Sequence, residues 1–149
     1  MQSVCSEVRA GPGFRPRIVW SVSDQIFADP RLAAIYDDID GDRADLEHYE
    51  AIVNELGADS VLDIGCGTGA LACRLARRGI TVSGLDPALA SLAVARTKPG
   101  ADRITWLVGD ATMLPSVVVD AVTMTGNVAQ VFLDDEEWSA VLVQLPRWR

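Results

Sequence analysis

The feature that most constrains this chain is a glycine-rich stretch at residues 61–69, which reads VLDIGCGTG. A short apolar run, typical of a strand, breaks there into three alternating glycines, and a helical pattern follows. Glycine is needed where φ is positive or where a ligand approaches the main chain without meeting a Cβ. Free N–H groups at the start of the following helix favour a carboxylate, a phosphate or a ribose hydroxyl. The stretch therefore indicates a loop that holds a nucleotide-like cofactor.

Strand and helix patterns alternate on both sides of this loop. Because this alternation is typical of βαβ units, we predict an α/β domain over residues 25–149, with a parallel sheet covered by helices on both faces. Residues 1–24 carry Gly, Pro and Arg without a period and are expected to form a loose arm. Strands are expected at 60–64, 80–85, 104–108 and within 117–124, and helices at 27–37, 43–56, 68–78, 88–97 and from 134.

Composition and charge exclude several classes of function. The chain has 149 residues, 49% of them hydrophobic, and a formal net charge of -8. Such a charge argues against nucleic acid as a partner, because that binding is driven by clustered Lys and Arg. The longest apolar runs are too short to span a membrane, and three cysteines make no disulfide framework. We therefore expect a cytoplasmic protein with reduced thiols and no membrane partner.

Two aspartates follow strands and should reach the same rim of the sheet as the glycine loop. Asp86 lies 21 residues after Gly65 and could accept hydrogen bonds from both hydroxyls of a ribose. The alternative for Asp86 is a helix cap before Pro87. Asp110 could accept from the exocyclic amine of adenine while the N–H of Ala111 donates to the ring. Its alternative is an ordinary turn aspartate.

Two cofactors combine ribose and adenine in this way. The spacing of Gly65, Gly67 and Ala70 satisfies the dinucleotide fingerprint, so NAD and an oxidoreductase stay open. Asp63, however, lies inside the strand two residues before Gly65. A carboxylate there suits a ligand with an ammonium group better than a pyrophosphate.

With these residues in place, the sequence resembles the class I S-adenosylmethionine-dependent methyltransferases, specifically a small-molecule branch of actinobacterial type. The resemblance covers about residues 27–142. It rests on the glycine stretch, on GLDP at 84–87, on GDA at 109–111 and on MTGNVAQVF at 124–132. The segment FADPRL at 27–32, with Tyr36 and Asp37, also looks like the start of that branch. The resemblance implies S-adenosylmethionine as cofactor and a small-molecule methyl acceptor.

The resemblance also implies roles for particular residues. Asp63 would hold the methionine amino group, Asp86 the ribose hydroxyls, and Tyr36 would cover the cofactor. Methyl transfer is an in-line displacement at an activated sulfonium, so no catalytic side chain and no metal ligand are expected. Cys66 and His48 are expected to be a packing residue and a surface or packing residue. The expected cofactor contacts are Tyr36, Asp63, Gly65, Cys66, Gly67, Gly69, Asp86, Pro87, Asp110, Ala111, Thr125 and Asn127.

The chain departs from the family pattern after its fourth strand. The family sheet has seven strands in the order 3-2-1-4-5-7-6, whereas this sequence suggests about four, in the order 3-2-1-4. We therefore expect a truncated member, either an active enzyme or a degenerate module that binds the cofactor without catalysis. The apolar strand at 117–124 would then form an exposed edge, through which the chain could form a homodimer.

Overall fold

The computed structural model describes residues 24–111, 114, 117–132, 135–145 and 147–148. The predicted arm, residues 1–24, lies outside the described residues except for Asp24. The elements, in chain order, are α1 (Gln25–Ala28), α2 (Pro30–Asp40), α3 (Asp45–Glu55), β1 (Ser60–Ile64), α4 (Ala70–Arg77), β2 (Thr81–Asp86), α5 (Leu89–Ala95), η1 (Ala101–Arg103), β3 (Ile104–Val108), β4 (Val118–Val119), β5 (Ala121–Thr123), η2 (Val128–Val131), α6 (Asp135–Gln144) and β6 (Arg147–Trp148).

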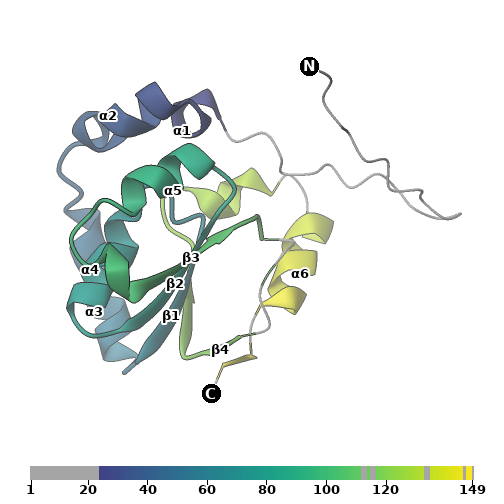
Figure 1. Cartoon of the computed structure of the whole chain (residues 1–149). Helices are drawn as coiled ribbons and strands as arrows, with labels where there is room; N and C mark the ends of the chain where they lie inside the picture. Colours follow the sequence, from purple (N-terminus) through teal and green to yellow (C-terminus); the bar gives the residue numbers. More distant parts are fainter. Residues whose placement is uncertain (1–23, 112–113, 115–116, 133–134, 146, 149) are drawn as a thin grey trace, which may run out of the picture.

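Four strands form a parallel sheet in the order β3-β2-β1-β5 (Figure 1). Asp63 on β1 stands in register with Gly84 on β2 and with Thr123 on β5. The predicted parallel α/β architecture is confirmed, and β5 takes the place expected for the fourth strand. Since all four strands run in one direction, the loops after β1, β2 and β5 meet at one rim.

The fourth strand was expected within residues 117–124, and β5 (Ala121–Thr123) lies inside that range, after a break at Asp120. Asp120 interrupts it, because its carboxylate accepts hydrogen bonds from the Ser60 N–H (2.8 Å) and the Ser60 hydroxyl (2.6 Å). The chain turns there toward the start of β1. The upstream piece, β4, pairs with β6 in a separate two-stranded sheet, and only the downstream piece, β5, joins the main sheet.

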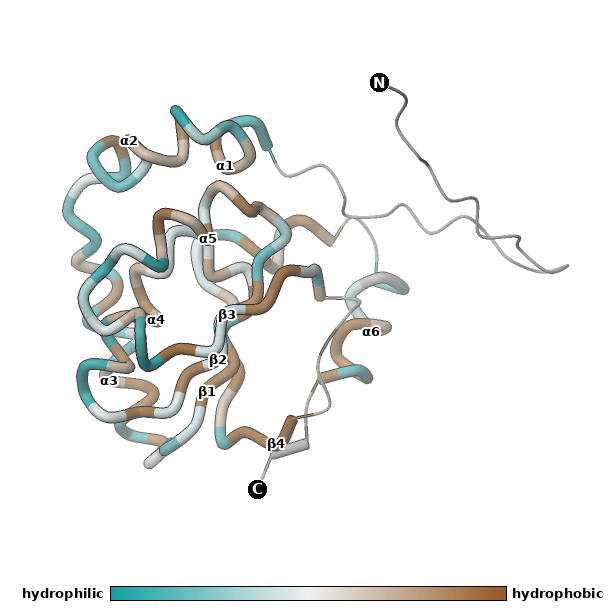
Figure 2. The backbone as a smooth tube through the Cα atoms, in the orientation of Figure 1, coloured by the Kyte–Doolittle hydropathy of each residue, from teal (hydrophilic) through white to brown (hydrophobic). Residues whose placement is uncertain are grey.

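Hydrophobic clusters cover both faces of the sheet, as the sequence predicts. One cluster joins the sheet to α3 and α4 through residues such as Leu46, Val53 and Leu75. The other includes Leu62 and Val141, which α6 contributes. Hydrophobic residues follow the strands, whereas α2 mixes hydrophilic and hydrophobic segments (Figure 2). No helix in the described part of the chain is both long and apolar enough to cross a membrane.

The first two helices form a separate layer, which we call the helical cover (residues 25–40). Asp29 caps α2 by accepting from the Arg31 N–H at 2.8 Å, with Pro30 at the first helical position, as predicted. The cover has little apolar burial: α1 has no buried residue, and α2 has only Ala33.

Candidate functional site

A cavity of about 330 Å³ opens at the carboxyl ends of β1, β2 and β5, between the glycine loop and the helical cover. Eight of the twelve predicted contact residues line it. They are Tyr36, Asp63, Gly65, Cys66, Gly67, Asp86, Pro87 and Thr125. The parallel sheet brings these residues together although they span 90 positions of the chain, from 36 to 125.

The three glycines of the loop serve different purposes, although all have positive φ angles. A Cβ on Gly67 would meet nothing within 4 Å, and this glycine lines the cavity, so its backbone is open to a ligand. A Cβ on Gly69 would lie 2.6 Å from Cη2 of Trp106, and one on Gly65 would lie 2.3 Å from a methyl of Val128. Gly67 is therefore the one of the three glycines with open space at its Cβ position, whereas Gly65 and Gly69 lack a Cβ because the side chains of Val128 and Trp106 occupy that space.

Asp86 holds the loop from the end of β2. Its Oδ2 accepts from the Gly67 N–H and its Oδ1 from the Ala88 N–H, both at 2.8 Å. The cap interpretation is thus visible in the geometry, with a second bond to the glycine loop that the sequence did not predict. Burial raises the pKa of this carboxyl, while the two backbone hydrogen bonds lower it. Asp86 also lines the cavity, where a ligand could reach it. Its binding of the ribose hydroxyls stays a prediction.

Asp63 is the buried charge of the site. Its residue is 1% exposed and lines the cavity. The Thr123 hydroxyl donates to Oδ1 at 2.7 Å and is its one hydrogen-bond partner among the described residues. Burial raises the pKa of Asp63 to about 7; the bond from Thr123 lowers it and the charge of Asp86 raises it further. A buried carboxylate with so few partners suits a cationic ligand.

The helical cover closes the cavity from the other side. The rings of Phe27 and Tyr36 pack in a tilted arrangement with centroids 5.1 Å apart, and both residues line the cavity. Burial and the charge of Asp40 raise the pKa of Tyr36. Arg43 also lines the cavity, but its guanidinium is shared between Asp40 (2.7 Å) and Asp45 (2.8 Å). The predicted position of Tyr36 over the cavity is consistent with this geometry.

The other four predicted residues do not line the cavity. Gly69 packs against Trp106, and Ala111 is buried in the hydrophobic cluster on the α6 side. Asn127 is exposed and takes a left-handed conformation at the start of η2. Asp110, after β3, also lies outside the residues that line the cavity. A position after a strand therefore does not by itself place a residue in the lining of the cavity.

Sequence reasoning missed several residues of the wall. Thr68, Ala70 and Leu71 could have been found, because they lie in the glycine loop or at the start of the helix that follows it; the others lie at or near the helical cover and α3, or after β5. The missed lining residues are Asp24, Phe27, Arg43, Leu46, Thr68, Ala70, Leu71, Val128 and Val131.

Other reactive side chains are placed as packing or surface residues. Cys66 is buried, and burial raises the pKa of its thiol, which argues against a thiolate nucleophile. His48 is exposed on α3. The described residues contain no group of three or more His, Cys, Asp or Glu side chains that could hold a metal ion.

Comparison with known proteins decides among the cofactors that such a cavity could hold. Residues 61–148 match the family model described as a methyltransferase domain. An uncharacterised methyltransferase of Oceanobacillus iheyensis is 35% identical over 121 residues, which cover 75% of this chain and 55% of the relative. The chain belongs to the class I S-adenosylmethionine-dependent methyltransferases.

Solved methyltransferases share the fold. An amino pentose methyltransferase from Micromonospora echinaspora, with S-adenosylmethionine bound, is 28% identical, with a TM-score of 0.57 over 64% of this chain and 42% of that one. The CcbJ methyltransferase from Streptomyces caelestis is 23% identical, with a TM-score of 0.69 over 82% and 53% of the two chains. The chain spans about half the length of the curated relative. Membership of this family disfavours the dinucleotide alternative.

Proposed function

We propose that this methyltransferase transfers a methyl group from S-adenosylmethionine to a small-molecule acceptor by in-line displacement. The observation that carries the proposal is Asp63, a buried carboxylate that faces a cavity with one hydrogen-bond partner among the described side chains. A cationic ligand would compensate the cost of burying this charge. The cofactor carries both an ammonium and a sulfonium group and so matches the charge of the site.

The residues of the chain fit the cofactor in three ways. Asp63 would bind the ammonium group, the backbone at Gly67 would leave room for the ligand, and Asp86 would hold the loop while facing the ribose. When bound, S-adenosylmethionine supplies an electrophilic methyl group on a sulfonium, which is already an activated leaving group. The chain then has to align the groups and exclude water, and the cover residues Phe27 and Tyr36 are placed to exclude it.

Two observations favour a small molecule as the methyl acceptor. The Micromonospora echinaspora structure is described as an amino pentose methyltransferase, a protein that acts on a small molecule. The acidic chain, with a formal charge of -8, disfavours nucleic acid as the acceptor. We therefore favour a small molecule without assigning its target atom.

Calorimetric titration with S-adenosylhomocysteine and, separately, with NADH tests the cofactor. We expect saturable binding of S-adenosylhomocysteine by the wild-type chain and none of NADH. Asp63→Asn keeps the size of the side chain but removes its charge, and should abolish measurable binding. Binding of NADH without S-adenosylhomocysteine would contradict the proposal. Incubation with radiolabelled S-adenosylmethionine and a panel of small amines, phenols and thiols then tests transfer.

A further inference from the structure

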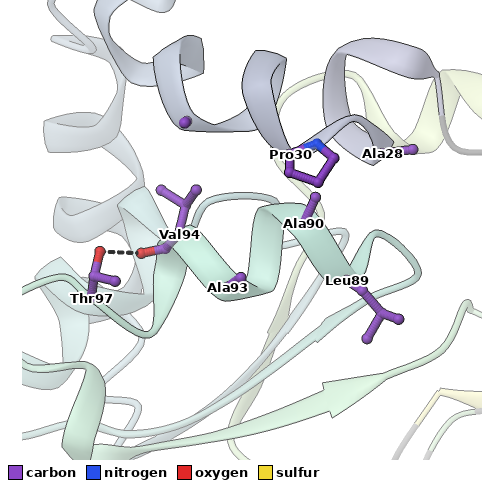
Figure 3. A pocket seen from close by; sticks show the side chains of 8 residues that line it. Ala28, Pro30, Leu89, Ala90, Ala93, Val94 and Thr97 are labelled. Atoms are coloured by element: carbon purple, nitrogen blue, oxygen red, sulfur yellow. Dashed lines mark hydrogen bonds between the residues drawn. The ribbon is translucent and has the colours of Figure 1, made fainter.

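The helical cover reaches the cavity but is poorly anchored by apolar packing. Ala33 is the one buried residue of α2, and α1 has none. Where the cover meets α5, a groove of about 680 Å³ runs between them, and most of its wall is small side chains such as Ala90 and Ala93 (Figure 3). Burying so little apolar surface contributes little to holding the cover in place.

Polar contacts hold the helical cover against the rest of the chain, and two of them involve Asp37. The Thr68 hydroxyl, in the glycine loop, donates to Oδ1 of Asp37 at 2.6 Å. The Lys98 ammonium, just beyond α5, lies 2.5 Å from Oδ2. A single carboxylate on α2 therefore joins the cover to two segments of the body that lie 30 residues apart in sequence. The Ser91 hydroxyl adds a third link, because it donates to the Phe27 carbonyl at 3.0 Å.

The position of these links connects them to the cavity. Thr68 is buried and lines the cavity, whereas Asp37 is not among the lining residues. Tyr36, next to Asp37, and Phe27, whose carbonyl receives the Ser91 bond, form the aromatic pair over the cavity. A change at Asp37 would thus loosen the cover and free the Thr68 hydroxyl without removing an atom of the cavity wall.

We propose that Asp37 is a positioning residue that clasps the helical cover onto the glycine loop and so controls how long the cofactor stays bound. Asp37 touches Thr68 and Lys98 but not the cavity, and acts through them. The proposal rests on the proposed function, because it assumes that the cavity binds S-adenosylmethionine. Opening and closing of a cover of this kind governs ligand exchange in many enzymes.

The test compares Asp37→Ala with Asp38→Ala. Asp38 is the next residue of the same helix and carries the same charge, but its side chain makes no hydrogen bond or ion pair within the described ranges. We expect Asp37→Ala to weaken S-adenosylhomocysteine binding by about five- to tenfold, mainly through faster dissociation, because a charge-assisted bond is lost at a half-exposed site. Asp38→Ala should bind like the wild type. Surface plasmon resonance gives both rate constants.

Further variants separate the two arms of the clasp. Asp37→Asn keeps an acceptor for Thr68 but loses the charge that faces Lys98, so its affinity should lie between those of wild type and Asp37→Ala. Lys98→Ala should weaken binding in the wild-type background but add little to Asp37→Ala. Because Asp37 and Lys98 are in contact, their effects on stability can also be non-additive, so the melting temperatures of the ligand-free variants are measured alongside the dissociation rates.

Hydrogen exchange on the ligand-free protein tests the clasp without the cofactor. Asp37→Ala should raise amide exchange in residues 25–40 while leaving β1 and β2 protected, and Asp38→Ala should not. Equal exchange and equal dissociation rates in the two variants would overturn the inference. If the wild type fails to bind S-adenosylhomocysteine, the proposed function is wrong, whereas exchange still decides whether Asp37 holds the cover.

Discussion

At the scale of the residue, Asp63 links burial, charge and ligand choice. Its position at the fourth residue of β1 puts it in register with Thr123, whose hydroxyl supplies its hydrogen bond. Burial is the main reason that its pKa rises to about 7. An aspartate in the unfolded chain has a pKa of about 3.9. Between about pH 4 and about pH 7, the Asp63 carboxyl therefore holds a proton in the native state that it releases in the unfolded state. The charge therefore disfavours the empty folded state at neutral pH and favours the state with a bound cation.

The first prediction is a pair of opposite pH dependences. The stability of the ligand-free chain should fall as pH rises from about 4 to about 7, because the native state holds a proton that the unfolded state releases. Affinity for S-adenosylhomocysteine should rise over the upper part of the same range, by up to about tenfold per unit below pH 7. Urea titrations and calorimetry at several pH values measure both.

The control for this prediction is Asp63→Asn. It should remove the carboxyl's contribution to the pH dependence of stability and raise the free energy of unfolding at pH 8, at the expense of binding. Between pH 5.5 and the pKa of about 7, the affinity of the wild type should rise about 30-fold. A constant affinity between pH 5.5 and 8 would show that ligand binding does not depend on this carboxylate.

At the scale of the element, the glycine loop must leave space for a ligand at one glycine and space for a neighbouring side chain at another. The sequence motif does not tell these two glycines apart. Gly67 is open on the side where a Cβ would stand and lines the cavity. Gly69 instead faces Trp106 and the Ala95 Cβ, at 2.6 and 2.9 Å from its ideal Cβ. Trp106 cannot turn away freely, because its indole N–H donates to the Ala101 carbonyl at 3.0 Å. The two glycines should therefore fail in different ways.

The second prediction contrasts Gly67→Ala with Gly69→Ala. Gly69→Ala should cost about 2–4 kcal/mol of stability, from overpacking together with the positive φ. Gly67→Ala should cost only about 1–2 kcal/mol, from its positive φ, but should weaken S-adenosylhomocysteine binding, because its methyl enters the cavity. Chemical unfolding and calorimetry on both variants provide the comparison. Equal losses of stability would contradict the assignment of separate roles.

At the scale of the whole molecule, the sheet is open on the side of β5. β5 bonds to β1, and no further strand joins the four-stranded sheet beyond it in the described part of the chain. Val143 on α6 is also exposed, at 85% of its surface. Open strand edges and exposed apolar side chains favour pairing with another chain.

The third prediction is that the chain forms a homodimer through the β5 edge, which would extend the sheet across two copies. Sedimentation velocity should show a dimer whose fraction decreases on dilution, since association follows mass action. The dimer should be insensitive to Asp38→Ala, which lies in the helical cover. A monomer at about 100 µM, far above the dissociation constant of a specific interface, would rule the dimer out.

Most of the fold was readable from local patterns because each element carries its own periodicity and its own ends. β1 and β3 have the bounds predicted from their apolar runs, and Asp29 and Pro30 start α2 as expected. The break at Asp120 was not readable, because it depends on hydrogen bonds to Ser60, which lies 60 residues away. The separate helix α1, before Asp29, also lay outside the predicted pattern.

The sequence by itself determined the family, the parallel sheet and the rim at which the cofactor residues gather, since glycine spacing and strand ends are local properties. Only the tertiary structure decided which rim side chains face the cavity. Asp110, Ala111 and Asn127 are not among the residues that line the cavity, Gly69 packs against Trp106, and Asp37 on the cover meets Thr68 in the glycine loop. The physical reason is that side-chain direction and long-range contact depend on how separate elements pack, and one residue's neighbours in sequence do not specify that packing.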